Sequence, residues 1–134
     1  MHRLIPFALA VIASPAAAAI EGERVQITGE VIDTWCYFSG VMGGPHRTCA
    51  LWCSAGGIPV GLLAPDGQVY MVLKMAGDDR TAGGDTSLNI AAHTIEADGM
   101  LYRRDGMNYL VVEKITADLD IINATHEDFG VIPG

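Results

Sequence analysis

Alternation of apolar and polar residues marks the start of the chain's folded part as a β-strand. Residues 24–35 alternate with a period of two, as in a strand that packs one face on a core. The residues on the predicted core side are Val25, Ile27, Val31 and Trp35. Gly29 interrupts the alternation and predicts a bulge or a sharp bend in the strand.

Four further apolar runs form two predicted hairpins. The first hairpin joins residues 58–64 to 68–74, and the second joins residues 94–104 to 108–116. Pro-Asp-Gly connects the first pair and Asp-Gly the second, and both are strong turn signals because glycine and aspartate tolerate the turn conformations. Between the hairpins, residues 86–92 favour a short helix.

Five strands, the first of them long and bent, are typical of a small barrel. The OB-fold has this strand count and a helical insert before the last strand pair, whereas a β-sandwich usually needs about seven strands. We therefore predict a mainly β protein: a small five-stranded OB-like barrel, with a short helix carrying cysteine and histidine inserted after strand 1.

The first 19 residues have the pattern of a secretory signal peptide. A basic start at Arg3 precedes a short apolar stretch and an Ala-x-Ala ending, which predicts cleavage after Ala19. The apolar stretch is too short to span a bilayer, which takes about 20 residues. The sequence thus predicts an exported protein, periplasmic or secreted. Residues 20–134 would form a single domain, with a C-terminal tail from about residue 117.

The net negative charge of the chain argues against some classes of binding partner. Its formal net charge is −8, and loss of Arg3 with the signal peptide would make it −9. Nucleic acids and anionic membranes bind clustered lysine and arginine, so neither is predicted as a partner. The sequence has no Ser-His-Asp arrangement, paired-carboxylate motif or phosphate loop, which favours a binding protein but leaves enzymatic activity open.

Every cysteine of the protein lies between residues 36 and 53, together with one histidine. A helix over residues 45–55 would place His46, Cys49 and Cys53 on one face, with neighbouring Cβ atoms ~5–6 Å apart. A disulfide between Cys49 and Cys53 fits this spacing poorly, because it needs Cβ atoms about 3.5–4.5 Å apart. The helix therefore favours chelation of a metal over cross-linking.

Cys36 is predicted to close the metal site from the end of the first strand. The glycine-rich residues 39–44 would let the chain turn back, although the strand parity of Cys36 points away from the core. The resulting Cys₃His set suits one transition-metal ion, Zn(II) or Cu(I), in a structural or a carrier role. Asp33 could orient His46, but an ordinary strand-end carboxylate is the simpler interpretation.

Three alternatives to a metal-binding function remain open from the residues alone. Exported proteins often pair their cysteines, so Cys36 could form a disulfide with Cys49 or Cys53. The chain could also be a thiol–disulfide redox protein that uses Cys49 and Cys53, although redox motifs usually have CxxC spacing. A third possibility is that the chain is an OB-like module that binds another exported protein, and that a metal or disulfide only stabilises its fold.

Three segments of the sequence resemble a group of small exported bacterial proteins of unknown function. These segments are DTWCYF, HRTCALWC and SAGGIPVGLLAPDGQVYMVL, which carry the pattern DxxCY…HxxCAxxC…GxPVG. The resemblance covers residues 28–74, extends more loosely to 115, and excludes the length of the loop at 77–85 and the chain from 116 onward. It implies an OB-like fold and a Cys₃His constellation, but no reaction.

Overall fold

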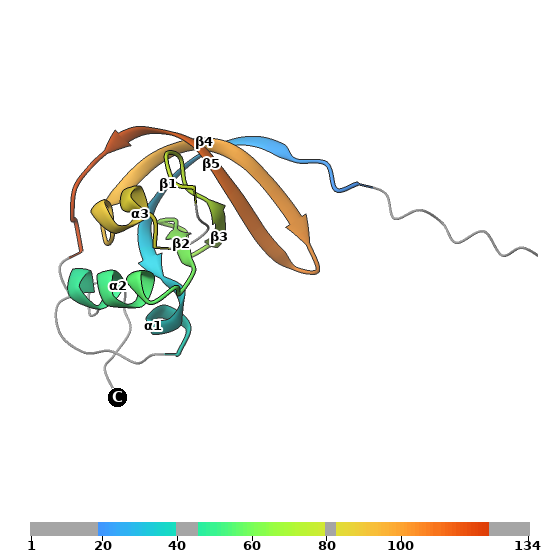
Figure 1. Ribbon diagram of the computed structural model, residues 1–134. Coiled ribbons are helices and arrows are strands. Elements are labelled where there is room, and N and C mark those ends of the chain that lie inside the picture. Colours follow the sequence, from blue (N-terminus) through green and yellow to red (C-terminus); the bar gives the residue numbers. More distant parts are fainter. Residues whose placement is uncertain (1–18, 40–45, 80–82, 124–134) are drawn as a thin grey trace, which may run out of the picture.

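A computed structural model describes residues 19–39, 46–79 and 83–123 (Figure 1). The strands are β1 (Glu23–Asp33), β2 (Val60–Leu63), β3 (Val69–Lys74), β4 (Thr94–Arg104) and β5 (Met107–Asp118). The helices in this part of the chain are α1 (Thr34–Ser39), α2 (His46–Ala55) and α3 (Asp85–Asn89). Residues 1–18, which contain nearly all of the predicted signal peptide, lie outside the described ranges. Within those ranges, no helix is long and apolar enough to cross a membrane.

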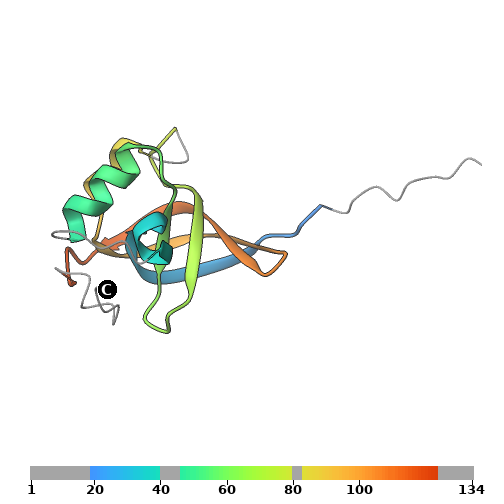
Figure 2. The ribbon, with the colours of Figure 1, turned by 90° about the horizontal axis from the view of Figure 1, so that it is seen from below.

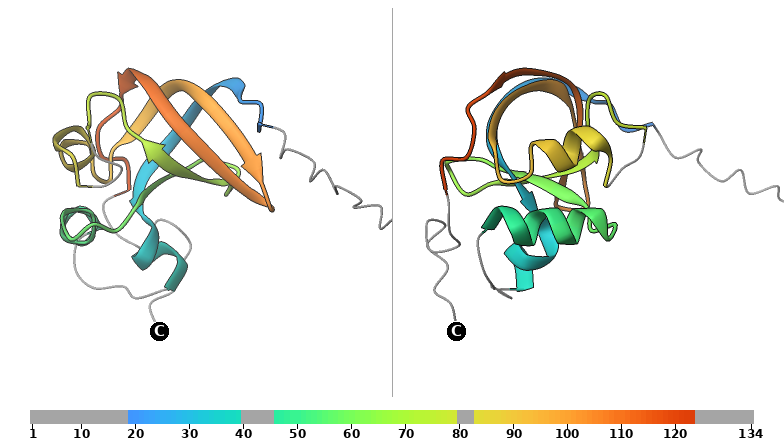
Figure 3. Two further views of the ribbon diagram at one scale, coloured as in Figure 1. Left: turned by 45° about the vertical axis from the view of Figure 1, so that its right-hand side comes forward. Right: turned by 60° about the vertical axis from the view of Figure 1, so that its left-hand side comes forward.

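The five strands close into a barrel in the order β1-β2-β3-β5-β4 (Figure 3). β1 pairs with β2 and with β4, and these pairs are antiparallel, as are β2–β3 and β4–β5. β3 and β5 pair in parallel and complete the ring. The predicted five-stranded OB-like barrel is confirmed, including the helix inserted after strand 1, which is α2; α1 was not predicted.

Gly29, where a bulge or a sharp bend was predicted, lies next to the point where β1 changes partners. Residues 23–30 pair with β4, and residues 30–33 pair with β2. Neither pairing of β1 shifts in register, so the alternative of a bulge is wrong. A Cβ at Gly29 would lie 3.1 Å from the Leu63 carbonyl oxygen, so glycine allows β2 to approach β1 closely.

Alternation along the strands places the core inside the barrel. Its buried members include Ile27, Val31, Val60, Leu62, Val72, Ile95, Leu110 and Val112. In β4, whose predicted and observed bounds agree, every second residue from Ile95 to Leu101 is buried. β1 departs from the predicted alternation at its end, where residues 29–33 are all buried. Trp35 is exposed, because β1 ends at Asp33 and Trp35 belongs to α1.

Helices α1 and α2, here called the helical module, lie outside the barrel beside the end of β1 (Figure 2). The module buries little apolar surface. Its buried residues are Thr34, Cys36, Ala50 and Ser54. Tyr37 and Leu51 are half-buried, and the large side chains of Trp35, Phe38 and Trp52 are exposed. Hydrophobic burial, which stabilises most helices in proteins, therefore contributes little to holding the module against the barrel.

The short helix predicted at residues 86–92 corresponds to α3, which is held by a buried carboxylate. Asp78 is 4% exposed and accepts hydrogen bonds from the Thr86 amide (2.8 Å), the Ser87 amide (2.9 Å) and the Ser87 hydroxyl (2.6 Å). Gly84 makes room for it, since a Cβ there would lie 2.3 Å from the Asp78 carboxyl carbon. Burial alone would raise the pKa of Asp78, but the hydrogen bonds from Ser87 and Thr86 outweigh it and hold the pKa below its ordinary value.

Replacing Asp78 with asparagine should therefore destabilise the protein in a pH-dependent way. A lowered folded-state pKa stabilises the fold above the unfolded value of about 3.9, and this contribution is lost as the pH falls through the folded-state pKa. We expect Asp78→Asn to lose about 1–3 kcal/mol at pH 7, and less at pH 3, by urea unfolding. Asp79→Asn, at the exposed neighbouring carboxylate, is the matched control. An equal loss at both pH values would contradict this role.

The predicted tail begins as an ordered continuation of the barrel. β5 runs to Asp118, and residues 119 and 120 exchange backbone hydrogen bonds with Thr94. The Asn123 side-chain amide then donates a hydrogen bond of 2.6 Å to the buried carboxylate of Glu30. Residues 124–134 lie outside the described ranges. The part of the tail that is described therefore packs along the barrel.

Candidate metal centre

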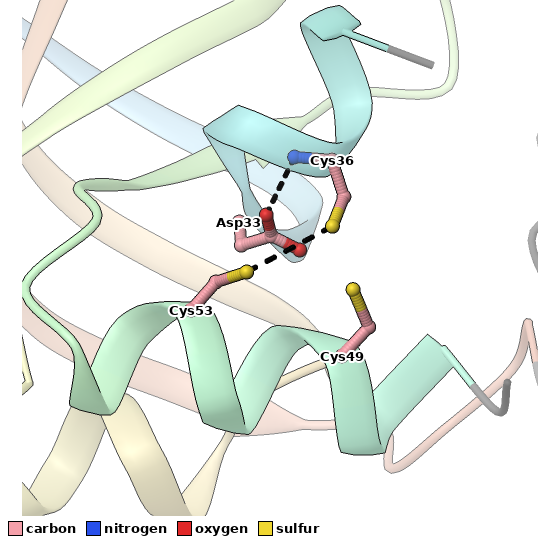
Figure 4. Close-up of side chains that lie close together, drawn as sticks. All are labelled: Asp33, Cys36, Cys49 and Cys53. Atoms are coloured by element: carbon pink, nitrogen blue, oxygen red, sulfur yellow. Dashed lines mark hydrogen bonds between the residues drawn. The ribbon is translucent and has the colours of Figure 1, made fainter. Parts of the chain in front are cut away.

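Asp33 ends β1 and starts α1. Its Oδ1 atom accepts a hydrogen bond of 2.7 Å from the backbone amide of Cys36, the third residue of the helix. This is the bond that an N-cap aspartate makes, and it satisfies one of the amides left free at a helix start. Cys36 was predicted at the end of the strand, and that placement is wrong, because Cys36 belongs to α1. Its side chain points toward Cys49 and Cys53 of α2, outside the barrel core, and the residue is only 3% exposed (Figure 4).

The predicted helix over residues 45–55 is present as α2, which begins at His46. Cys49 and Cys53 are one turn apart, half-buried, and point toward α1 and the end of β1 (Figure 4). The His46 side chain lies outside the described part of the structure, as does Pro45. The role of His46 as a ligand therefore stays a prediction.

The structure brings the three predicted cysteines together. The sulfurs of Cys36, Cys49 and Cys53 and a carboxylate oxygen of Asp33 all lie within 4.8 Å of one another. We call these four residues the donor cluster. The Sγ atoms of Cys36 and Cys53 are 3.8 Å apart, and all three cysteines are free. Two sulfurs bound at about 2.3 Å to a tetrahedral metal are themselves about 3.8 Å apart, whereas a disulfide bond measures about 2.05 Å.

The second carboxylate oxygen of Asp33 faces the sulfurs. Asp33 is 1% exposed, and its Oδ2 atom is buried without a hydrogen-bond partner in the described part of the chain. Figure 4 shows Oδ1 directed at the Cys36 amide and the other oxygen directed toward the thiols. A buried carboxylate oxygen without a partner is unfavourable. A cation among these four donors would satisfy it.

The sequence suggested Asp33 as a partner for His46 or, more simply, as an ordinary strand-end carboxylate, and not as a member of the cluster. The signal for its actual position was the Asp-Thr-Trp-Cys run, in which an N-cap aspartate precedes a cysteine by three residues. That signal was masked by the alternation of the preceding strand, which appeared to continue through Trp35.

Burial and the nearby negative charge of Asp33 both raise the pKa of the Cys36 and Cys53 thiols. Burial is the main cause that raises the pKa of Cys36, and a hydrogen bond with Cys49 adds to it. Burial also raises the pKa of Cys53, as does the nearby charge of Asp33. Without a cation the thiols of Cys36 and Cys53 are protonated at neutral pH, so a metal ion must displace protons to bind.

Comparison with known proteins leaves the site to be interpreted from its own geometry. No family model, no curated protein and no solved structure matches this chain. The resemblance to small exported bacterial proteins thus stays a prediction. The donor cluster itself could hold a metal ion, because three thiols and a carboxylate from separate elements converge on one point.

Proposed function

We propose that this chain is an exported protein that binds one transition-metal ion, Zn(II) or Cu(I), chiefly to stabilise its own fold. The observation that carries the proposal is the convergence of four metal-binding side chains to within 4.8 Å. Three thiolates are the common core of structural zinc sites and also suit Cu(I). The export part of the proposal rests on the signal-peptide pattern of residues 1–19.

A structural role follows from what the ion would connect. Asp33 belongs to β1, Cys36 to α1, and Cys49 and Cys53 to α2. The helical module has few buried apolar side chains of its own, and three of its four aromatic residues are exposed, Trp52 by 79%, while Tyr37 is half-buried. An ion bound by all three elements would supply the cross-link that the packing lacks. A carrier site would leave the module equally well folded without its ion.

The thiol–disulfide redox alternative has less support. Reactive cysteines in oxidoreductases have a lowered pKa, which keeps the thiolate available at neutral pH. Here burial raises the pKa of Cys36 and of Cys53. The Cys49–Cys53 spacing also lacks the CxxC arrangement of most redox motifs. Metal binding needs neither a lowered thiol pKa nor CxxC spacing, because the ion itself displaces the thiol protons when it binds.

Native mass spectrometry of protein purified from its exported compartment, combined with elemental analysis, tests the proposal. We expect one metal ion per chain and three unoxidised thiols. Cys36→Ser should lose the metal together with the folded helical module. A mass two hydrogens lower, with no metal, would instead favour a disulfide. A Cys36→Ser protein that keeps its fold and merely binds the metal more weakly would favour a carrier and contradict the structural role.

A further inference from the structure

We infer that Asp33 is the fourth ligand of the metal, and that the resulting set of three sulfurs and one oxygen selects a divalent ion such as Zn(II) over Cu(I). This inference rests on the proposed metal-binding function and assigns the metal class of that same site. It departs from the Cys₃His set predicted from the sequence.

The two oxygens of Asp33 have separate tasks. Oδ1 accepts the hydrogen bond from the Cys36 amide at 2.7 Å, which fixes the plane and direction of the carboxylate. Oδ2 is then held in place, buried, without a hydrogen-bond partner in the described residues, and directed toward the sulfurs (Figure 4). A ligand fixed in this way loses little freedom on binding a metal. The helix cap therefore orients the fourth ligand.

Charge favours a divalent ion over a monovalent one. With its thiols deprotonated, the donor cluster carries four negative charges on groups that are buried or half-buried. A divalent ion offsets two of these charges and Cu(I) only one, and the remainder is costly where water is largely excluded. Arg47, the basic residue of α2 whose side chain is described, does not offset this negative charge. Arg47 donates hydrogen bonds to the carbonyl oxygens of Asn89 and Ala91 instead.

Ligand chemistry points in the same direction. Zinc accepts cysteine sulfur and carboxylate oxygen together, at about 2.3 Å and 2.0–2.2 Å respectively. Cu(I) prefers soft sulfur donors, so it would bind the three thiolates and leave the carboxylate of Asp33 without a cation. The oxygen that Cu(I) leaves unsatisfied is the one that zinc would use.

Asp33→Asn separates ligation from capping. Asparagine caps helices about as well as aspartate and has nearly the same shape, so the barrel and α1 should be retained. Its neutral amide is a much weaker metal ligand than a carboxylate. We expect Zn(II) affinity, measured by competition with a chromophoric chelator, to fall at least about 100-fold, since even outer-shell changes cost 10–100-fold. Cu(I) affinity should change less than about threefold. His46→Gln is the matched control and should leave both affinities unchanged.

Several outcomes would overturn the inference while leaving the proposed function intact. Unchanged Zn(II) affinity in Asp33→Asn is one, and loss of Zn(II) in His46→Gln is another. Stoichiometric replacement of zinc by equimolar Cu(I) in the wild-type protein is a third. A wild-type protein that binds neither ion would overturn both the inference and the proposed function.

A measurement on the wild-type protein covers the case in which Asp33→Asn fails to fold. X-ray absorption at the zinc edge should find three sulfurs and one light atom, without the outer-shell scattering of an imidazole ring. That result would support Asp33 as the fourth ligand. Imidazole scattering would assign the position to His46 and overturn the inference.

Discussion

Removing the metal with a chelator should lower the thermal unfolding midpoint of this protein by on the order of 15 °C. A ligand that binds only the folded state, at a free concentration 1,000 times its Kd, stabilises that state by about 4 kcal/mol. For a domain of this size, 1 kcal/mol corresponds to roughly 4 °C in the midpoint. The reason is structural: the donor cluster connects β1, α1 and α2, and the helical module of α1 and α2 buries few apolar side chains.

Hydrogen exchange would locate this effect within the molecule. On chelation, amides of α2 should exchange much faster, while amides in the middle of β4, paired on both sides with β1 and β5, should stay protected. A variant with both Cys49→Ser and Cys53→Ser is the control and should not respond to the chelator. An unchanged midpoint in wild-type protein shown to have lost its metal would contradict the structural role.

Leu62→Ala should destabilise the barrel by about 2–5 kcal/mol. Leu62 is 0% exposed and belongs to the core, and its β2 position pairs with Val31 on one side and Tyr70 on the other. Truncation would leave a cavity between strands that surrounding side chains cannot easily fill. Urea unfolding of the metal-loaded protein measures the loss.

Leu73→Ala is the matched control for this substitution. Leu73 lies on the neighbouring strand β3 and is 41% exposed, so its truncation should change stability by no more than about 0.5 kcal/mol. Neither substitution removes a member of the donor cluster, and both folded proteins should bind one metal ion per chain. Equal destabilisation by the two variants would mean that the core is not where the structure places it.

The hairpins and the barrel followed from local signals in the sequence. Asp105 and Gly106 both adopt positive φ, as a two-residue turn that matches the strand twist requires. Gly67 also has positive φ in the Pro-Asp-Gly turn. The alternation of β4 was clear enough to give both of its ends. Such signals suffice because turn chemistry and strand periodicity act over only a few residues.

The end of β1 was misjudged because two local signals conflict there. Strand periodicity continues through Trp35, whereas a helix cap begins at Asp33. The cap prevails in the structure: the strand ends at Asp33, Cys36 is buried and the large indole of Trp35 lies in solvent. The burial of Cys36 and the exposure of Trp35 depend on what packs against this segment, which the sequence alone does not show.

By itself, the sequence determined the five strands, their turns and the presence of three cysteines and a histidine close together along the chain. Only the tertiary structure decided that Asp33 joins these cysteines and that Cys36 does so from a helix. The physical reason is that a donor cluster depends on distances between separate helices and strands, which are set by how these elements pack. Here the pairing of β1 with β2 and the packing of α2 beside β1 bring Asp33 and Cys36 within reach of Cys49 and Cys53.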